Sequence, residues 1–186
     1  MRTPLLAIAL LSLFGRAHVS IMPVFARDVF AVGPQGLGVM LTMPALGTLA
    51  AGGLMGAFAS VATGRRFLAT SVASGLALAA FGLSPNFLMA LICLVVSGGL
   101  STACTTLANT LIQERVKDRF RGRVMSYVMA TGWGGWRLGA LPVAMGVPLV
   151  GAPIAVALDG LLLVVSLLPL GLASPAGTPS KGIRRG

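Results

Sequence analysis

The chain has 186 residues, of which 56% are hydrophobic and only 10% are charged. Soluble domains average about 45–50% apolar and about 25% charged residues, so this composition excludes an ordinary soluble domain, a disordered chain and a disulfide scaffold. The net charge of +10 lies in segments between apolar runs. That placement argues against a nucleic-acid surface and favours the charged loops of a membrane protein.

Six apolar runs are long enough to cross a bilayer, since a spanning helix needs about 20 residues. They cover 4–26, 37–62, 67–83, 87–112, 124–149 and 153–172. The segments between them are 27–36, 63–66, 84–86, 113–123 and 150–152. We therefore predict an all-α, polytopic membrane protein with a six-helix transmembrane bundle over 1–172 and a basic tail over 173–186.

The basic residues predict how this bundle is oriented. If the helices alternate, Arg27 lies on one side, Arg16 and Arg137 lie within helices, and the other 11 of the 14 Lys and Arg residues share the side of the two termini. The positive-inside rule then places both termini in the cytoplasm. The run 4–14 with Gly15 and Ala17 also fits a cleaved signal peptide, but the apolar stretch continues and favours an intact helix.

The basic segment Leu107–Ser126, LANTLIQERVKDRFRGRVMS, is the most distinctive in the chain. It resembles the loop between the fourth and fifth helices in the second half of major facilitator superfamily (MFS) transporters, in the bacterial branch of enterobactin-exporter-like permeases. The segments Pro23–Asp28 and Gly36–Gly38 are similar to the first helix and loop of that half, and Gly64–Arg66 to the end of a loop motif. The resemblance covers about residues 1–172.

The resemblance implies secondary active transport in the bacterial cytoplasmic (inner) membrane, with efflux of small amphipathic organic compounds by alternating access. Val61 and Ala62 stand where the family's loop motif has Asp and Arg. The chain also has about six helices, whereas family members have about twelve. Because the two halves are parallel repeats about an axis along the membrane normal, a homodimer would restore that symmetry. A separate first-half partner, a non-transporting remnant and a membrane subunit remain open alternatives.

Three residues that are charged at pH 7 fall within the predicted spans, where a charge costs at least about 2.5–3.5 kcal/mol. Arg16 is either a cation in the transport path or a structural partner of a neighbouring helix. Trp133 and Arg137, four residues apart, either form a cation–π pair or substrate platform or belong to a helix–helix seam. Asp159 is either the counter-ion of Arg137 or a proton-coupling carboxylate.

Two further residues are weighed as parts of the path. Asn109 belongs to the small and hydroxylated face of the fourth span, which packs helices together or lines a hydrophilic path. His18 is either a packing residue or a proton carrier. These alternatives give Arg16, Asn109, Trp133, Arg137 and Asp159 as the transport-path candidates.

A second group of charged residues is predicted at the cytoplasmic face, as a topogenic surface attracted to anionic lipid or as a gate. It consists of Arg65, Arg66, Glu114, Arg115, Asp118, Arg121 and Arg123. The chain has one His and four acidic residues, too few for a metal-ligand cluster. Cys93 and Cys104 lie about 16 Å apart along one helix, which excludes a mutual disulfide. We expect no cofactor and no enzymatic site.

Overall fold

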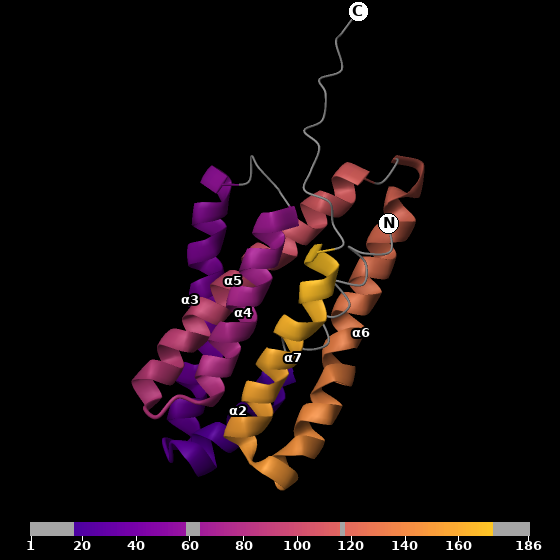
Figure 1. Cartoon of the computed structure of the whole chain (residues 1–186). Helices are drawn as coiled ribbons and strands as arrows, with labels where there is room; N and C mark the ends of the chain where they lie inside the picture. The colour runs from indigo at the N-terminus through magenta and orange to yellow at the C-terminus, as the bar shows by residue number, and fades with distance from the viewer. Residues whose placement is uncertain (1–16, 59–63, 116–117, 173–186) are drawn as a thin grey trace, which may run out of the picture.

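The computed structural model describes residues 17–58, 64–115 and 118–172. Within these ranges every element is helical, which confirms the all-α prediction (Figure 1). A 3-10 turn (Ala17–Ile21), the short helix α2 (Met22–Val24) and a π-helical turn (Phe25–Val29) form one initial helical segment. The longer helices are α3 (Gly33–Phe58), α4 (Gly64–Gly82), α5 (Phe87–Arg115), α6 (Asp118–Val150) and α7 (Ala152–Leu172).

The first connection is shorter than the sequence predicts. Helical geometry continues to Val29, and α3 begins at Gly33 instead of residue 37, so the connection is 30–32 and not 27–36. Pro34 lies in the first turn of α3, where its missing N–H and fixed φ suit a helix start. Gly33 has φ +68°, a conformation that a residue with a Cβ rarely adopts.

The prediction of a loop over 113–123 is also wrong for the described residues. Helix α5 continues to Arg115, and α6 begins at Asp118. Glu, Arg and Lys have high intrinsic helix propensity, so this charged segment extends both helices. Helix α4 likewise begins at Gly64, which places Arg65 and Arg66 in its first turn instead of in a loop over 63–66.

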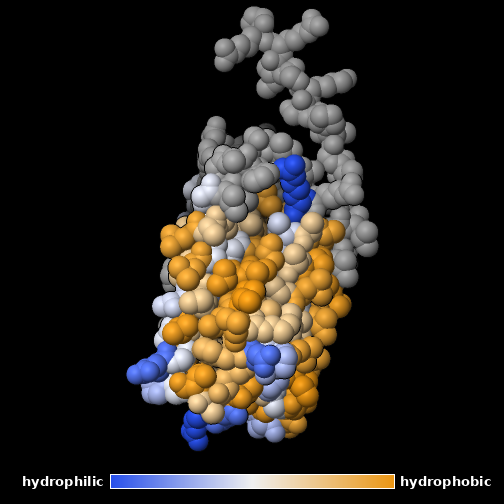
Figure 2. All heavy atoms as spheres, turned by 90° about the vertical axis from the view of Figure 1, so that its left-hand side faces the viewer, coloured by the Kyte–Doolittle hydropathy of each residue, from blue (hydrophilic) through white to orange (hydrophobic). Residues whose placement is uncertain are grey.

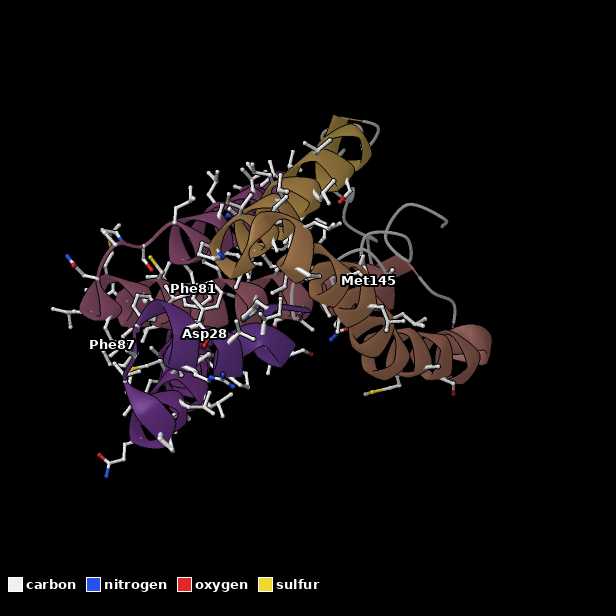
Figure 3. All side chains as sticks on the ribbon, turned by 90° about the horizontal axis from the view of Figure 1, so that it is seen from below. Asp28, Phe81, Phe87 and Met145 are labelled. Atoms are coloured by element: carbon white, nitrogen blue, oxygen red, sulfur yellow. The ribbon has the colours of Figure 1, made fainter. Side chains whose placement is uncertain are left out.

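The helices form a bundle in which sequence neighbours are not always spatial neighbours (Figure 1). Helix α3 packs against α5, and α4 packs against both α5 and α7. Helix α6 meets chiefly α7 and the initial segment. Seen from below, α6, marked by Met145, lies well to one side of the group formed by α3, α4 and α5 (Figure 3).

Small residues bring α4 and α7 into backbone contact. A Cβ added to Gly160 of α7 would lie 2.5 Å from the carbonyl oxygen of Gly75 and 2.7 Å from the backbone nitrogen of Ala79. A Cβ on Gly82 would lie 2.7 Å from the carbonyl oxygen of Pro153. Only glycine permits so close an approach, the arrangement that small residues give to packed transmembrane helices.

Helices α3 and α5 meet in the same way. Added Cβ atoms on Gly47 and Gly98 would collide with the backbones of Val95 and Pro44, respectively. Across the same seam, the hydroxyl oxygens of Thr48 and Thr102 lie 3.0 Å apart and share a hydrogen bond. Close packing and a polar contact therefore coincide between these two helices.

Aromatic rings fill the end of the bundle where the connections 30–32 and 83–86 lie. The ring centroids of Phe25 and Phe81 are 4.8 Å apart, and those of Phe30 and Phe87 are 5.7 Å apart. Phe25 and Phe81 are fully buried. Figure 3 shows Phe81 and Phe87 on this end of the bundle, with Asp28 nearby. The rings join the initial segment to α4 and α5.

The outer surface is apolar over long stretches. Leu49 of α3 is 73% exposed and Leu149 of α6 is 83% exposed. Figure 2 shows hydrophobic residues over the middle of one face and hydrophilic residues gathered toward its lower end. Two described helical segments are long and apolar enough to cross a membrane, by length and composition alone: Gly33–Gly53, with mean hydropathy 1.3, and Phe87–Thr110, with mean hydropathy 2.1.

Candidate functional site

A pocket of about 190 Å³ lies between the initial segment, α3 and α5. Each element contributes three side chains, and Gly98 of α5 contributes backbone, so the wall combines hydroxyl groups with apolar ones. The lining residues are His18, Val19, Met22, Leu41, Pro44, Thr48, Ser97, Gly98, Ser101 and Thr102.

Helical periodicity explains why these residues meet. Residues four positions apart share one face of a helix, so Ser101 lies one turn after Ser97 on α5, and Thr102 lies one turn after Gly98 on the adjoining face. Pro44 and Thr48 do the same on α3. The close approach at Gly98 then brings the two polar faces to opposite walls of one pocket.

The hydroxyl groups of the wall are tied to their own helices. The Thr102 hydroxyl donates to the carbonyl oxygen of Gly98 over 2.9 Å, and the Thr48 hydroxyl to that of Pro44 over 3.0 Å. The Ser97 hydroxyl donates to the carbonyl oxygen of Leu94 over 3.1 Å. In such an arrangement the hydroxyl oxygen keeps lone pairs that can accept further hydrogen bonds.

His18 forms part of the wall and is itself buried, with 6% of its surface exposed. Its ring lies edge-on to Phe81, with centroids 6.3 Å apart. His18 therefore packs against the aromatic cluster and also borders the pocket. Its position is compatible with a packing residue and with a proton carrier.

Two predicted path residues lie outside this pocket. Asn109 follows Thr102 on α5 by seven residues, about 10 Å along the helix axis. Its side-chain oxygen is buried and has no hydrogen-bond partner among the described residues. Asn109 therefore continues the polar face of α5 beyond the pocket.

Asp159 lies on a different side of the bundle. It is 2% exposed, and neither carboxylate oxygen has a hydrogen-bond partner in the described part of the chain. Ala155, one turn earlier, faces Gly146 of α6, where an added Cβ would be 3.7 Å from the Ala155 Cβ. Residues four apart share a helix face, so Asp159 belongs to the seam between α7 and α6.

The other path candidates are placed only in part. Arg16 lies outside the described residues, and Trp133 and Arg137 lie within helix α6 but their side chains are outside the described part. The pairing of Arg137 with Asp159 stays a prediction. Among the described residues, one ion pair joins Arg27 Nε and Asp28 Oδ1 over 3.2 Å, and both side chains are exposed.

The charged residues predicted at the cytoplasmic face lie at helix ends. Arg66 is exposed in the first turn of α4. The end of α5 and the start of α6 lie at the same end of the bundle (Figure 1). The side chains of the other six members of this group lie outside the described part: Arg65, Glu114, Arg115, Asp118, Arg121 and Arg123.

Sequence reasoning missed two polar contacts between helices. Thr48 is the counterpart of Thr102, and the buried hydroxyl of Ser71 lies 2.7 Å from the sulfur of Cys104. Cys93 and Cys104 are both free thiols. A Thr one turn after Pro44 and next to Gly47 is the only sequence signal for the first contact, and it is a weak one.

A second hollow, of about 400 Å³, lies beside Arg27 at the end of the bundle where Asp28 is labelled (Figure 3). Its wall is otherwise apolar or backbone. The lining residues are Pro23, Ala26, Arg27, Ala31, Gly33, Pro34 and Leu37. In the described part of the chain, no group of three or more His, Cys, Asp or Glu residues could hold a metal ion.

Comparison of the chain with protein-family models, with curated proteins and with solved structures finds no match. Among the described residues, the pocket between the initial segment, α3 and α5 combines an imidazole with four hydroxyl groups. This pocket is therefore the candidate functional site.

Proposed function

We propose that the chain is a membrane-embedded, half-length secondary transporter of the MFS type that exports small amphipathic organic compounds by alternating access. In this proposal the pocket bordered by His18, Thr48 and Thr102 is part of the substrate path. The observation that carries it is a cluster of hydroxyl groups and an imidazole enclosed by helices with apolar outer faces. In a bilayer, polar groups of this kind are concentrated where a path or a cavity needs them.

The bundle also suits insertion into a bilayer. The glycine contacts between α3 and α5 and between α4 and α7 are of the kind that holds helices together in lipid, where no hydrophobic force drives helix association. In the predicted alternating topology, most basic residues share the side of the termini, which favours a cytoplasmic location for both. The bacterial inner membrane is the location that the family resemblance implies.

The partner of this half is part of the proposal. A path between two halves needs a second six-helix bundle, either another copy of this chain or a separate first half. The second candidate function is a non-transporting remnant or membrane subunit. Its support is the presence of Val61 and Ala62 where the family that the chain resembles carries charges.

Flux through liposomes that contain only this chain tests the proposal. The probes are small amphipathic anions, neutral compounds and cations, each compared with protein-free liposomes. We expect the wild-type chain to give flux for at least one class. Ser101→Leu fills the pocket and should lower that flux at least tenfold. Thr105→Leu is the matched control, since Thr105 is exposed one turn further along α5.

Three results would narrow or refute the proposal. Equal flux in the Ser101→Leu and Thr105→Leu variants would remove the pocket from the path. Absence of flux for the wild-type chain, with rescue by a separate six-helix partner, would favour a split transporter. Absence of flux without any such rescue would favour the non-transporting alternative.

A further inference from the structure

The hydroxyl groups of the pocket wall offer hydrogen-bond acceptors more readily than donors. Thr48 and Thr102 have one hydroxyl hydrogen each, and these two hydrogens are shared among the carbonyl oxygens of Pro44 and Gly98 and the contact between the hydroxyls themselves. The Ser97 hydrogen is likewise directed to the carbonyl oxygen of Leu94. Three of the four hydroxyl groups on the wall have thus used their hydrogens within the protein.

We infer that the pocket binds the head group of a small amphipathic amine, whose N–H groups donate to the hydroxyl oxygens of Thr48, Thr102 and Ser97. That this amine is a substrate rests on the proposed function. Amine and ammonium groups supply several N–H donors from one nitrogen, which matches a wall of acceptors. Val19, Met22 and Leu41 line the same pocket and can hold the hydrocarbon part.

The size of the pocket limits the ligand. Liquid water occupies about 30 Å³ per molecule, so a cavity of this size holds about six water-sized groups. The cavity volume is about 190 Å³. An amine with five carbon atoms fills that space, whereas a larger compound would place only its head group there.

A carboxylate suits the pocket less well. It accepts hydrogen bonds and donates none, so at Thr48, Thr102 or Ser97 it would require a hydroxyl group to leave its helix carbonyl. The lining residues include no Lys or Arg to pair with a carboxylate and no Asp or Glu to pair with an ammonium ion, so the preference for an amine rests on N–H donation and not on charge. Each hydroxyl that turns away from its carbonyl loses a hydrogen bond within the protein, an effect of about fivefold on affinity.

Calorimetric titration of the full chain in lipid nanodiscs tests the inference, with empty nanodiscs as the blank. The probes share one hydrocarbon chain: n-pentylamine, n-pentanol, n-pentanoate and n-pentyltrimethylammonium. We expect n-pentylamine to bind at least tenfold more tightly than n-pentanoate, with n-pentanol between them. The quaternary ion has the positive charge without an N–H group and should bind more weakly than n-pentylamine.

A matched pair of variants locates the binding. Thr102→Val removes the hydroxyl group on the pocket wall and should weaken n-pentylamine binding about fivefold, the effect of one hydrogen bond. Thr106→Val removes a hydroxyl with the same i−4 bond, to the carbonyl oxygen of Thr102, from a residue that does not line the pocket. Thr106→Val should bind as the wild type does. Thr102→Ser keeps the hydroxyl oxygen and should bind n-pentylamine as the wild type does. This variant tests the role of the oxygen even if Thr102→Val disturbs folding.

Tighter binding of n-pentanoate than of n-pentylamine would overturn the inference. So would equal binding of the quaternary ion, because charge and not N–H donation would then select the ligand. Calorimetry detects binding without flux. Amine binding that depends on Thr102, in a chain that transports nothing in liposomes with or without a separate six-helix partner, would therefore leave the inference standing and refute the proposed function.

Discussion

The contact between α4 and α7 makes a specific prediction about stability. Gly160→Ala adds one methyl group at a point where its Cβ would lie 2.5 Å from the Gly75 carbonyl oxygen and 2.7 Å from the Ala79 backbone nitrogen. Both neighbours are backbone atoms, so no side-chain rotation can relieve the overlap. The two helices must separate locally for the methyl group to fit.

The size of the effect follows from two opposing terms. Inserting a methylene-sized group into a packed seam costs about 1–3 kcal/mol. Replacing Gly by Ala within a helix contributes about 0.5–1 kcal/mol of stability through backbone entropy. We therefore expect Gly160→Ala to lower the free energy of unfolding by about 1–2 kcal/mol.

Gly38→Ala is the matched control. Gly38 lies within α3, and a Cβ at this position would meet nothing within 4 Å. Only the helix term applies there, so this variant should be more stable than the wild type by about 0.5–1 kcal/mol. The two alanine variants should thus differ in sign.

Unfolding by a denaturing detergent in mixed micelles, followed by circular dichroism, measures both variants against the wild type. The transition of Gly160→Ala should shift to a lower detergent fraction, and that of Gly38→Ala to a higher one. Two variants of equal stability would refute the reasoning, because Gly160 would then have the same open surroundings as Gly38. The arrangement of α4 against α7 would have to be revised.

Two further predictions concern buried side chains. Phe81→Ala removes a ring whose centroid lies 4.8 Å from that of Phe25, and it should lower the free energy of unfolding by about 3–5 kcal/mol in the same unfolding assay. Leu83 is 65% exposed, so Leu83→Ala should change the free energy of unfolding by less than about 0.5 kcal/mol. Equal losses would mean that Phe81 is not in the core. Asp159→Asn keeps the shape of a carboxyl that is 2% exposed, and we expect a stable chain whose transport no longer responds to a proton gradient. Loss of expression would instead favour an ion pair with Arg137, and a normal response to the gradient would reject both roles.

The positions of several helix ends follow from single residues of the sequence. Ser84, Pro85 and Asn86 lie between α4 and α5, and Gly151 takes φ +84° between α6 and α7. Turn-forming residues act locally, so the sequence alone indicates them. The prediction of a loop over 113–123 is wrong because charge indicates contact with water, and an exposed helix end is as polar as a loop.

The sequence alone indicates only the part of the pocket wall that α5 provides. The spacing of Ser97, Ser101 and Thr102 indicates a polar face on α5, which sequence reasoning weighed as a path lining. Thr48 is 54 residues away from its partner Thr102. Nothing local to Thr48 shows which helix it will meet, because that depends on the close approach of Gly47 and Gly98.

The glycine seams divide the molecule mechanically. Backbone contact fastens α3 to α5 and α4 to α7, and the Ser71–Cys104 contact ties α4 to α5. At Gly146 of α6, by contrast, an added Cβ would reach only ordinary contact distance from Ala155. Four helices are thus joined by backbone or polar contacts, and we expect a shift of α6 at Gly146 to meet less resistance than a shift within either seam. A change in the tilt of α6 would alter the surroundings of Asp159 without breaking either seam.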